Sequence, residues 1–437
     1  MTHLLRRLPE RKRTDMSHAP LHSAPPTEGT ASLLTVIELV RSGTALTRPQ
    51  LQAATGLNRA VIAQRVEQAK RLGYLEDSLL APSTGGRAPR TLRFRADAGV
   101  LLVCVAGERQ LHAGITDLDG VVLASSRRDR GIDLGPRSTV DAAAGMLEEL
   151  LERHGPRSRV WGVGIGLPGP VDSATGRTVA ALATSRRDDI DLRTALVERF
   201  HAPVWIDGTS RLLARAERRH RRWGADADLL LVTVGTGITA ALLSRGVPHR
   251  GAAGAAGDLG HVRIPTGTHR CRCGRTGCLE AEAGGWALVR DAHVALAQGR
   301  GSVLSGHRDG LGGLAPVDLA IAAREGDALA RELLERSSVL VGEAIAPLVS
   351  VLAPTAVVVG GAVASAGELY LAGVRRSVRQ LATPTATRDL RIALSLDGED
   401  GPLVGAAETV RDQLFEISFP RWIGQGAPTV AAMDPTG

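Results

Sequence analysis

The chain has 437 residues, a formal net charge of +7, 43% hydrophobic residues and only 3% aromatic ones. This length exceeds what one hydrophobic core usually organises, so two or three domains are expected. The apolar runs are short, and the arginine-rich amino terminus lacks the apolar segment of a secretory signal. These features argue against a membrane-spanning or exported protein and predict a cytoplasmic one without a membrane partner.

The basic surplus is confined to the first hundred residues, which hold 15 Lys or Arg against 8 Asp or Glu, while the remainder holds 38 of each class. A surplus on one small domain is typical of a protein that contacts nucleic-acid phosphates. A solvated basic tail is the alternative, because the segment from Arg6 to Arg13 supplies five of the positive charges. We expect residues 1–29 to form a disordered basic tail.

Residues 30–97 are predicted to fold as a winged helix-turn-helix domain. Apolar residues recur at helical spacing between Leu33 and Val40, which indicates a first helix. A second helix is expected over 47–56, because Thr is a favoured cap and Gly a favoured terminator, and a third helix follows the capping residue Asn58.

The predicted wing is a Gly-containing turn at 83–87 followed by an alternating strand at 91–95. In such a domain the third helix enters the major groove of DNA, and the wing reaches phosphates or the minor groove. A helical hairpin used only for dimerisation is the alternative, but it explains neither the wing nor the charge. The candidate DNA contacts are Arg59, Gln64, Arg65, Arg87 and Arg90.

Residues 98–415 alternate apolar strand runs with helical patterns, as two α/β lobes would. A strand pair with a turn at Asp119-Gly120 is expected first. Residues 416–437 are expected to be a disordered carboxyl-terminal tail. The predicted strands are 100–105, 111–116, 160–165, 204–206, 229–234 and 357–359, and the predicted helices include 140–153 and 316–352.

Three of the four cysteines fall within eight residues, and a histidine stands just upstream of them. Zn²⁺ favours four sulfur and nitrogen ligands in a tetrahedron, and a Cys3His set is typical of a structural rather than a catalytic zinc site. A cluster of free thiols is the alternative, and it is disfavoured because so scarce a residue is concentrated in one Gly-rich loop. The candidate metal ligands are His261, Cys271, Cys273 and Cys278.

The segments Gly257–His261 (Gly-Asp-Leu-Gly-His) and Cys271–Glu280 (Cys-x-Cys-Gly-x-x-Gly-Cys-Leu-Glu) resemble the signature of the ROK family of repressors, open reading frames and sugar kinases. The resemblance extends from about Thr30 to about Phe415, and the amino-terminal segment resembles that of ROK repressors. It implies an α/β fold with a winged helix-turn-helix domain and a two-lobed actin-like, hexokinase-like (ribonuclease H-like) ROK domain at 98–415.

The resemblance also implies roles for the residues of the loop at 257–280. Zinc would order this loop without touching the substrate, and His261 would face both the metal and the sugar. Asp258 and Glu280 match acidic sugar contacts, although the family usually has Glu where this chain has Asp258. Asp258, His261 and Glu280 are therefore the candidate effector contacts, with loop scaffolding as the alternative role.

The sequence departs from the kinase pattern at two places. Residues 105–109 stand where ROK kinases have an Asp-x-Gly-x-Thr phosphate loop, and only the glycine remains, while Glu108 adds negative charge where phosphates would lie. The general-base position holds Thr209, which is not a base near neutral pH, and a sugar-binding amide position holds Gly208. Asp207 is a poor substitute because adjacent side chains of a strand point to opposite faces. We therefore assign no catalytic residue.

The resulting hypothesis is a non-enzymatic ROK transcriptional regulator, a repressor, whose impaired sugar-kinase-like domain senses a sugar or sugar derivative and contains structural zinc. Double-stranded operator DNA and a homodimer or homotetramer are the expected partners. A working ATP-dependent sugar kinase, similar to glucokinase or N-acetylhexosamine kinase, with an appended DNA-binding domain is the alternative. A DNA-binding protein that responds to no metabolite is a third possibility.

Overall fold

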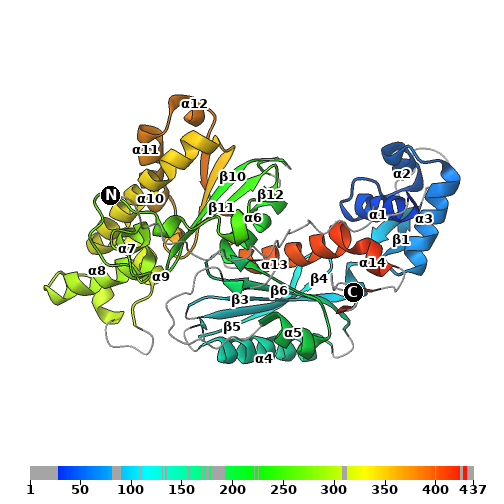
Figure 1. Ribbon diagram of the computed structural model, residues 1–437, viewed down its shortest axis with the longest axis horizontal. Helices are drawn as coiled ribbons and strands as arrows, with labels where there is room; N and C mark the ends of the chain where they lie inside the picture. The colour runs from blue at the N-terminus through cyan, green and yellow to red at the C-terminus, as the bar shows by residue number, and fades with distance from the viewer. Residues whose placement is uncertain are drawn as a thin grey trace, which may run out of the picture.

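Figure 1 shows three units in the chain, a helical unit near the amino terminus and two α/β lobes. The expected tail up to residue 27 and the expected wing turn at 83–87 lie outside the residues that the structure describes. No described helix is both long and apolar enough to cross a membrane. A computed structural model of the protein describes residues 28–80, 90–108, 110–129, 131–132, 135–155, 158–169, 171–172, 177–178, 192–220, 222–224, 226–307, 313–398, 400–423 and 427–430.

The amino-terminal unit has the three predicted helices, and the predicted strand at 91–95 pairs antiparallel with a strand at 75–80. The second helix begins with a reciprocal cap, because the Thr47 hydroxyl accepts a hydrogen bond from the Gln50 N–H and the Gln50 side chain accepts one from the Thr47 N–H. The first helix begins at Glu28, so the end of the expected tail belongs to it. The elements are α1 (Glu28–Arg41), α2 (Arg48–Thr55), α3 (Arg59–Arg71), β1 (Leu75–Leu80) and β2 (Arg90–Phe94).

The first lobe is built on a five-stranded sheet with the order β5-β4-β3-β6-β9, and α4 and α5 cover one of its faces (Figure 1). The expected turn at Asp119-Gly120 does not join the first two strands; it joins β4 to a third strand, β5, which the sequence prediction lacked. The elements are β3 (Val100–Ala106), β4 (Leu111–Asp117), β5 (Val122–Arg128), α4 (Pro136–His154), β6 (Val160–Leu167), β7 (Val171–Asp172), β8 (Arg177–Thr178), α5 (Leu192–Phe200) and β9 (Val204–Gly208).

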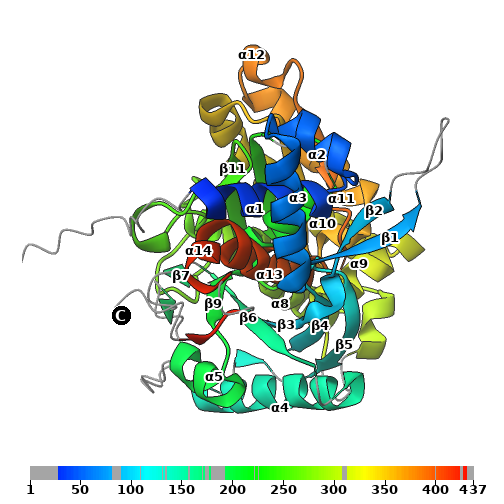
Figure 2. The same cartoon turned by 90° about the vertical axis from the view of Figure 1, so that its right-hand side faces the viewer.

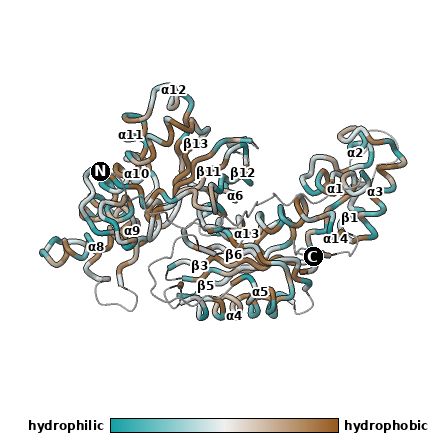
Figure 3. The backbone as a smooth tube through the Cα atoms, in the orientation of Figure 1, coloured by the Kyte–Doolittle hydropathy of each residue, from teal (hydrophilic) through white to brown (hydrophobic). Residues whose placement is uncertain are grey.

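The second lobe has a five-stranded sheet with the order β12-β11-β10-β13-β14, and its strand β13 is among the most hydrophobic parts of the trace in Figure 3. The helix expected over 316–352 is two helices, because Gly326 ends the first with a φ of 103° and Asp327 caps the second. The elements are β10 (Leu229–Val234), β11 (Ile238–Ser244), β12 (Val247–Pro248), α7 (Leu279–Ala283), α8 (Gly285–Ala297), α9 (Pro316–Glu325), α10 (Ala328–Leu352), β13 (Ala356–Gly360), α11 (Glu368–Leu381), α12 (Pro384–Thr387) and β14 (Arg391–Leu394).

Helices α6 (Thr209–Arg219) and α13 (Gly401–Asp412) pack against each other between the two sheets (Figure 1). Their backbones meet so closely that a Cβ atom on Gly405 would lie 1.8 Å from the Leu212 carbonyl oxygen. A buried ion pair joins the same helices, with Arg215 Nη1 2.6 Å from Asp412 Oδ2. The contact between these two helices connects the lobes.

The carboxyl-terminal segment differs from the expected tail. After α13 the chain forms a π-helical turn at Gln413–Ile417 and a short helix α14 (Phe419–Trp422), which lies beside α1 (Figure 2). Trp422 is fully buried, and its ring centroid lies 6.0 Å from that of Tyr74 in the amino-terminal unit and 5.5 Å from that of Trp161 in the first lobe. Residues 416–423 therefore join two units, because long-range aromatic packing orders a segment with little local pattern.

Candidate metal centre and effector cleft

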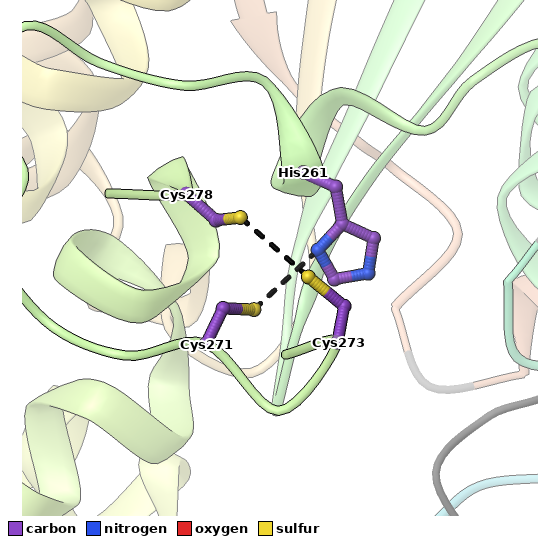
Figure 4. A group of neighbouring side chains, drawn as sticks. All are labelled: His261, Cys271, Cys273 and Cys278. Carbon is purple, nitrogen blue, oxygen red and sulfur yellow. Dashed lines mark hydrogen bonds between the residues drawn. The ribbon is translucent and has the colours of Figure 1, made fainter. Parts of the chain in front are cut away.

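The four predicted metal ligands come together in the second lobe (Figure 4), where their ligand atoms all lie within 4.8 Å of one another. The Sγ atoms of Cys273 and Cys278 are 3.7 Å apart, and Cys271 Sγ is 3.6 Å from His261 Nδ1. Tetrahedral bonds of about 2.3 Å to sulfur and about 2.0–2.1 Å to nitrogen would separate two sulfurs by about 3.8 Å and a sulfur from a nitrogen by about 3.6 Å. The donor set therefore fits Zn²⁺ in both ligand type and spacing.

The loop that holds these ligands is fixed by its own backbone. Ile264 N–H donates to the Gly277 carbonyl, and the backbones of Gly267 and Gly277 approach so closely that a Cβ on Gly267 would lie 2.6 Å from Gly277 Cα. Glu282 accepts hydrogen bonds from two further backbone N–H groups of the loop, at Thr268 and His269. The loop is thus held in a conformation that presents the four ligands together.

The electrostatics differ among the three thiols of the loop, because burial raises the pKa of Cys271 to about 12 and also raises that of Cys278, whereas the pKa of Cys273 is lowered. Burial acts against ionisation, but hydrogen bonds from Arg275 and from the neighbouring thiols lower the pKa of Cys273 to about 6. A thiolate is the form of cysteine that binds metal ions. Zn²⁺ held by Cys271, Cys273, Cys278 and His261 would supply a structural cross-link, because all four tetrahedral positions are taken by the protein.

The predicted effector contacts surround the same histidine. His261 directs Nδ1 toward Cys271, and its Nε2 lies 3.9 Å from Asp258 Oδ1, so the ring stands between the metal ligands and a carboxylate. Glu280 lies against the same turn, where its oxygens accept hydrogen bonds from Ile238 N–H and Trp286 Nε1–H, each at 3.0 Å. Asp258 is exposed, whereas Glu280 is held by the scaffold.

The end of β9 carries a buried ion cluster. Asp207 is 1% exposed, and its Oδ1 accepts hydrogen bonds from Arg211 Nε at 2.5 Å and from Gly208 N–H at 2.7 Å. Its Oδ2 lies 3.1 Å from Arg250 Nη2. The Thr209 hydroxyl donates to the Leu167 carbonyl at 3.1 Å. Both oxygens of Asp207 therefore lie close to guanidinium groups.

Arg211 and Arg250 are site residues that the sequence reasoning missed. Arg211 donates to the carbonyls of Val171 at 2.7 Å and Gly254 at 3.1 Å, which brings the first lobe against a loop of the second. The spacing of Asp207 and Arg211, four residues apart across the start of a helix, was the available local signal. Arg250 comes from the end of β12, so no local pattern links it to Asp207.

Glu108, at the position of the phosphate loop, contacts the metal loop. Its Oε2 accepts a hydrogen bond from Arg272 Nη1 at 2.9 Å, and the Arg272 guanidinium lies over the Trp286 ring, 4.8 Å from its centroid. A carboxylate of the first lobe is therefore paired with a cation of the second at the place where the kinase pattern requires phosphate binding.

The predicted DNA contacts differ in how exposed their side chains are. Arg59 and Gln64 are exposed on α3, whereas Arg65 is partly buried, where Nε donates to Ser32 Oγ at 2.9 Å and Nη1 donates to Gln68 Oε1 at 3.0 Å. Arg65 thus packs α3 against α1. Arg87 and the Arg90 side chain lie outside the described residues.

Comparisons with known proteins agree with this architecture. The model of the ROK family matches residues 103–413. The chain belongs to the ROK family. It is similar to the xylose repressor of Caldicellulosiruptor bescii (25% identity, covering 89% of this chain and 97% of that one) and to a glucokinase of Halalkalibacterium halodurans (30% identity, covering 64% and 85%).

A solved structure extends the likeness of the fold. The crystal structure of a ROK family transcriptional regulator, a homolog of the E. coli MLC protein, matches with a TM-score of 0.73 at 22% identity, covering 89% of this chain and 98% of that one. The predicted α/β fold with actin-like, hexokinase-like lobes is confirmed.

Proposed function

We propose that this ROK protein is a DNA-binding transcriptional regulator, a repressor, in which a zinc-stabilised ROK domain senses a small molecule. The observation that carries the proposal is the extent of the two matches. Similarity to the xylose repressor covers 89% of the chain, whereas similarity to the glucokinase covers 64%. The longer match takes in residues before the family domain, where the three-helix unit with its basic surplus is found.

The amino-terminal unit is proposed to bind operator DNA as a winged helix-turn-helix domain. The exposed Arg59 and Gln64 on α3 suit contacts with base edges or phosphates in the major groove, and Arg87 and Arg90 remain the candidate wing contacts. Arg65 instead supports the position of α3 on α1. Two such heads in a homodimer or homotetramer would read a symmetric operator.

The ROK domain is proposed to act as a sensor and not as an enzyme. At the end of β9, the part of the described chain that matches the base position, a threonine replaces the base and the adjacent carboxylate is paired with two arginines, which argues against transfer of the hydroxyl proton of a sugar. Glu108 also places negative charge at the phosphate position. Asp258, His261 and Glu280 remain the proposed effector contacts, and zinc on the four loop ligands would keep them in place.

The test is binding of the full-length, zinc-loaded protein to the DNA upstream of its own gene, compared with a scrambled duplex, by fluorescence anisotropy across a salt series. Sequence preference that persists at high salt supports the proposal, because non-specific phosphate contacts weaken steeply with salt. Arg59→Ala is expected to weaken specific binding by about 1–3 kcal/mol. Arg379→Ala, an exposed arginine on α11, is the matched control. Equal affinity for both duplexes would contradict the proposal.

The 30% identity to a glucokinase favours the second candidate, a working sugar kinase with an added DNA-binding domain. Sugar-dependent release of ADP from ATP measures this activity directly. A turnover within the ordinary range of kinases, about 1–100 per second, would establish the kinase and remove the argument from Thr209 and Asp207.

A further inference from the structure

The place where the kinase pattern has a base is, in this chain, a buried cluster rich in arginine. Arg211 and Arg250 approach the Asp207 carboxylate from opposite lobes, with Nε of Arg211 2.5 Å from Oδ1 and Nη2 of Arg250 3.1 Å from Oδ2. Arg215, one helical turn beyond Arg211, pairs with Asp412 at 2.6 Å. Asp412 is shared with further arginines of α6 and α13. Cations therefore outnumber the carboxylates available to them.

Two guanidinium nitrogens in this cluster lack an acceptor. Within the described part of the chain, Arg250 Nη1 and Arg215 Nε are buried and have no hydrogen-bond partner. Asp207 Oδ2 is close to Arg250 but outside hydrogen-bond geometry. Burial, together with the nearby positive charges of Arg218 and Arg250, lowers the pKa of Arg215 although Asp412 opposes this effect. The two unmet donors indicate buried positive charge without sufficient hydrogen-bond acceptors.

The cluster lies at the amino terminus of α6, an 11-residue helix that begins at Thr209; the preceding residue, Gly208, provides no side-chain cap, and its own N–H donates to Asp207 Oδ1. Unsatisfied N–H groups and the helix dipole favour an anion at such a terminus. Asp207 is 1% exposed, but the Arg250 side chain is 31% exposed and comes from the second lobe. Arg250 is therefore the residue through which solvent has access to the Asp207 ion pairs, because the Asp207 and Arg211 side chains are buried.

We propose that the effector is a sugar derivative carrying an anionic group, a phosphate or a carboxylate, and that this group binds Arg250 beside the amino terminus of α6. This inference rests on the proposed sensor function of the ROK domain. An anion offers only acceptors, which is what the unpartnered guanidinium nitrogens require. A neutral hexose supplies no counter-charge. Because Arg250 and α6 belong to different lobes, the bound anion favours one relative placement of the lobes.

The alternative role of Arg250 is to neutralise Asp207 and nothing more. In that case removal of the Arg250 charge lowers stability but does not change which ligands bind. A stability measurement alone does not separate the two roles, so ligand affinity has to be measured on variants that remain folded and zinc-loaded.

The experiment is isothermal titration calorimetry of the full-length, zinc-loaded protein without DNA, using glucose, glucose 6-phosphate and gluconate as probes. At least one anion is expected to bind at least tenfold more tightly than glucose, and the difference between the two anions assigns phosphate or carboxylate. Arg250→Gln is expected to weaken anion binding at least tenfold, and Arg250→Lys to retain part of it. Arg245→Gln, which removes an exposed arginine five residues away, is expected to leave the affinity unchanged.

The inference is overturned if neither anion binds more tightly than glucose, or if Arg250→Gln weakens anion binding no more than Arg245→Gln does. It is also overturned if both Arg250 variants lose their fold and their zinc while the wild-type protein prefers glucose. DNA binding of the ligand-free protein is measured in a separate titration. If the protein binds an anion but shows no specific DNA binding, the repressor function alone is contradicted. If it binds DNA specifically but prefers no anion, the anion site alone is contradicted.

Discussion

Replacing Trp422 with Ala tests whether the carboxyl-terminal segment is a structural element or a tail. The Trp422 side chain is fully buried, and its ring lies between 5.2 and 6.0 Å, centroid to centroid, from four other aromatic rings. Its Nε1–H also donates to the Leu414 carbonyl at 3.0 Å. Loss of a buried Trp or Phe side chain costs about 3–5 kcal/mol. The aromatic contacts and the lost hydrogen bond place Trp422→Ala toward the upper end of that range, although Ser418 Oγ also donates to the Leu414 carbonyl at 3.3 Å.

The assay is urea unfolding of the full-length protein followed by far-UV circular dichroism, with limited proteolysis to detect release of the amino-terminal unit. Ile417→Ala is the matched control, because Ile417 lies in the same segment but is 57% exposed, so its loss should change stability by no more than about 0.5 kcal/mol. If Trp422→Ala costs less than about 1 kcal/mol, or no more than Ile417→Ala, the segment is a tail and the packing argument is refuted.

Metal removal and the buried carboxylate provide two further tests. Cys278→Ser is expected to lose zinc, measured by atomic absorption, and to have a lower melting temperature. Its control is Cys104→Ala, which changes a thiol in β3, outside the metal loop, and should retain about one zinc per chain. Equal zinc content in the two variants would contradict the Cys3His assignment. Asp207→Asn is expected to cost about 3–5 kcal/mol in urea unfolding, because it leaves buried guanidinium charge uncompensated. The exposed Asp226→Asn is its control, and equal stability of the two variants would show that the cluster tolerates the loss of its carboxylate.

The features that the sequence predicted well are those whose signal is local. The metal ligands fall within 18 residues of sequence, so spacing and ligand chemistry were enough to identify them. The helices of the amino-terminal unit follow from caps at Thr47 and Asn58 and from an apolar face, and both caps are formed as expected. The parallel strands β3, β6, β9, β10 and β13 likewise follow from short apolar runs bounded by turns, whereas the parallel strand β14 was not predicted.

The features that the sequence did not predict depend on distant partners. Residues 416–423 contain two aromatic residues, Phe419 and Trp422, without a clear periodicity, and the burial of these rings depends on Tyr74 and Trp161, which are hundreds of residues away. Arg250 meets Asp207 only when the two sheets are brought together, and Arg65 meets Ser32 only when α1 crosses α3. Local patterns place such residues on an element but leave their partners open.

These long-range contacts connect the two lobes to the amino-terminal unit. Helix α13 crosses α6 in backbone contact between the sheets, and its continuation α14 packs on Tyr74 at the end of α3. A second connection is polar, because Arg41 of α1 pairs with Asp119 at 3.0 Å, and the adjacent Gly120 carbonyl accepts a hydrogen bond from Arg219 of α6 at 2.9 Å. A packed crossing of this kind shifts between discrete arrangements instead of deforming continuously. A ligand that changes the placement of the lobes therefore acts first on the contact between α6 and α13. Both connections transmit that change to the packing of α1 and α3.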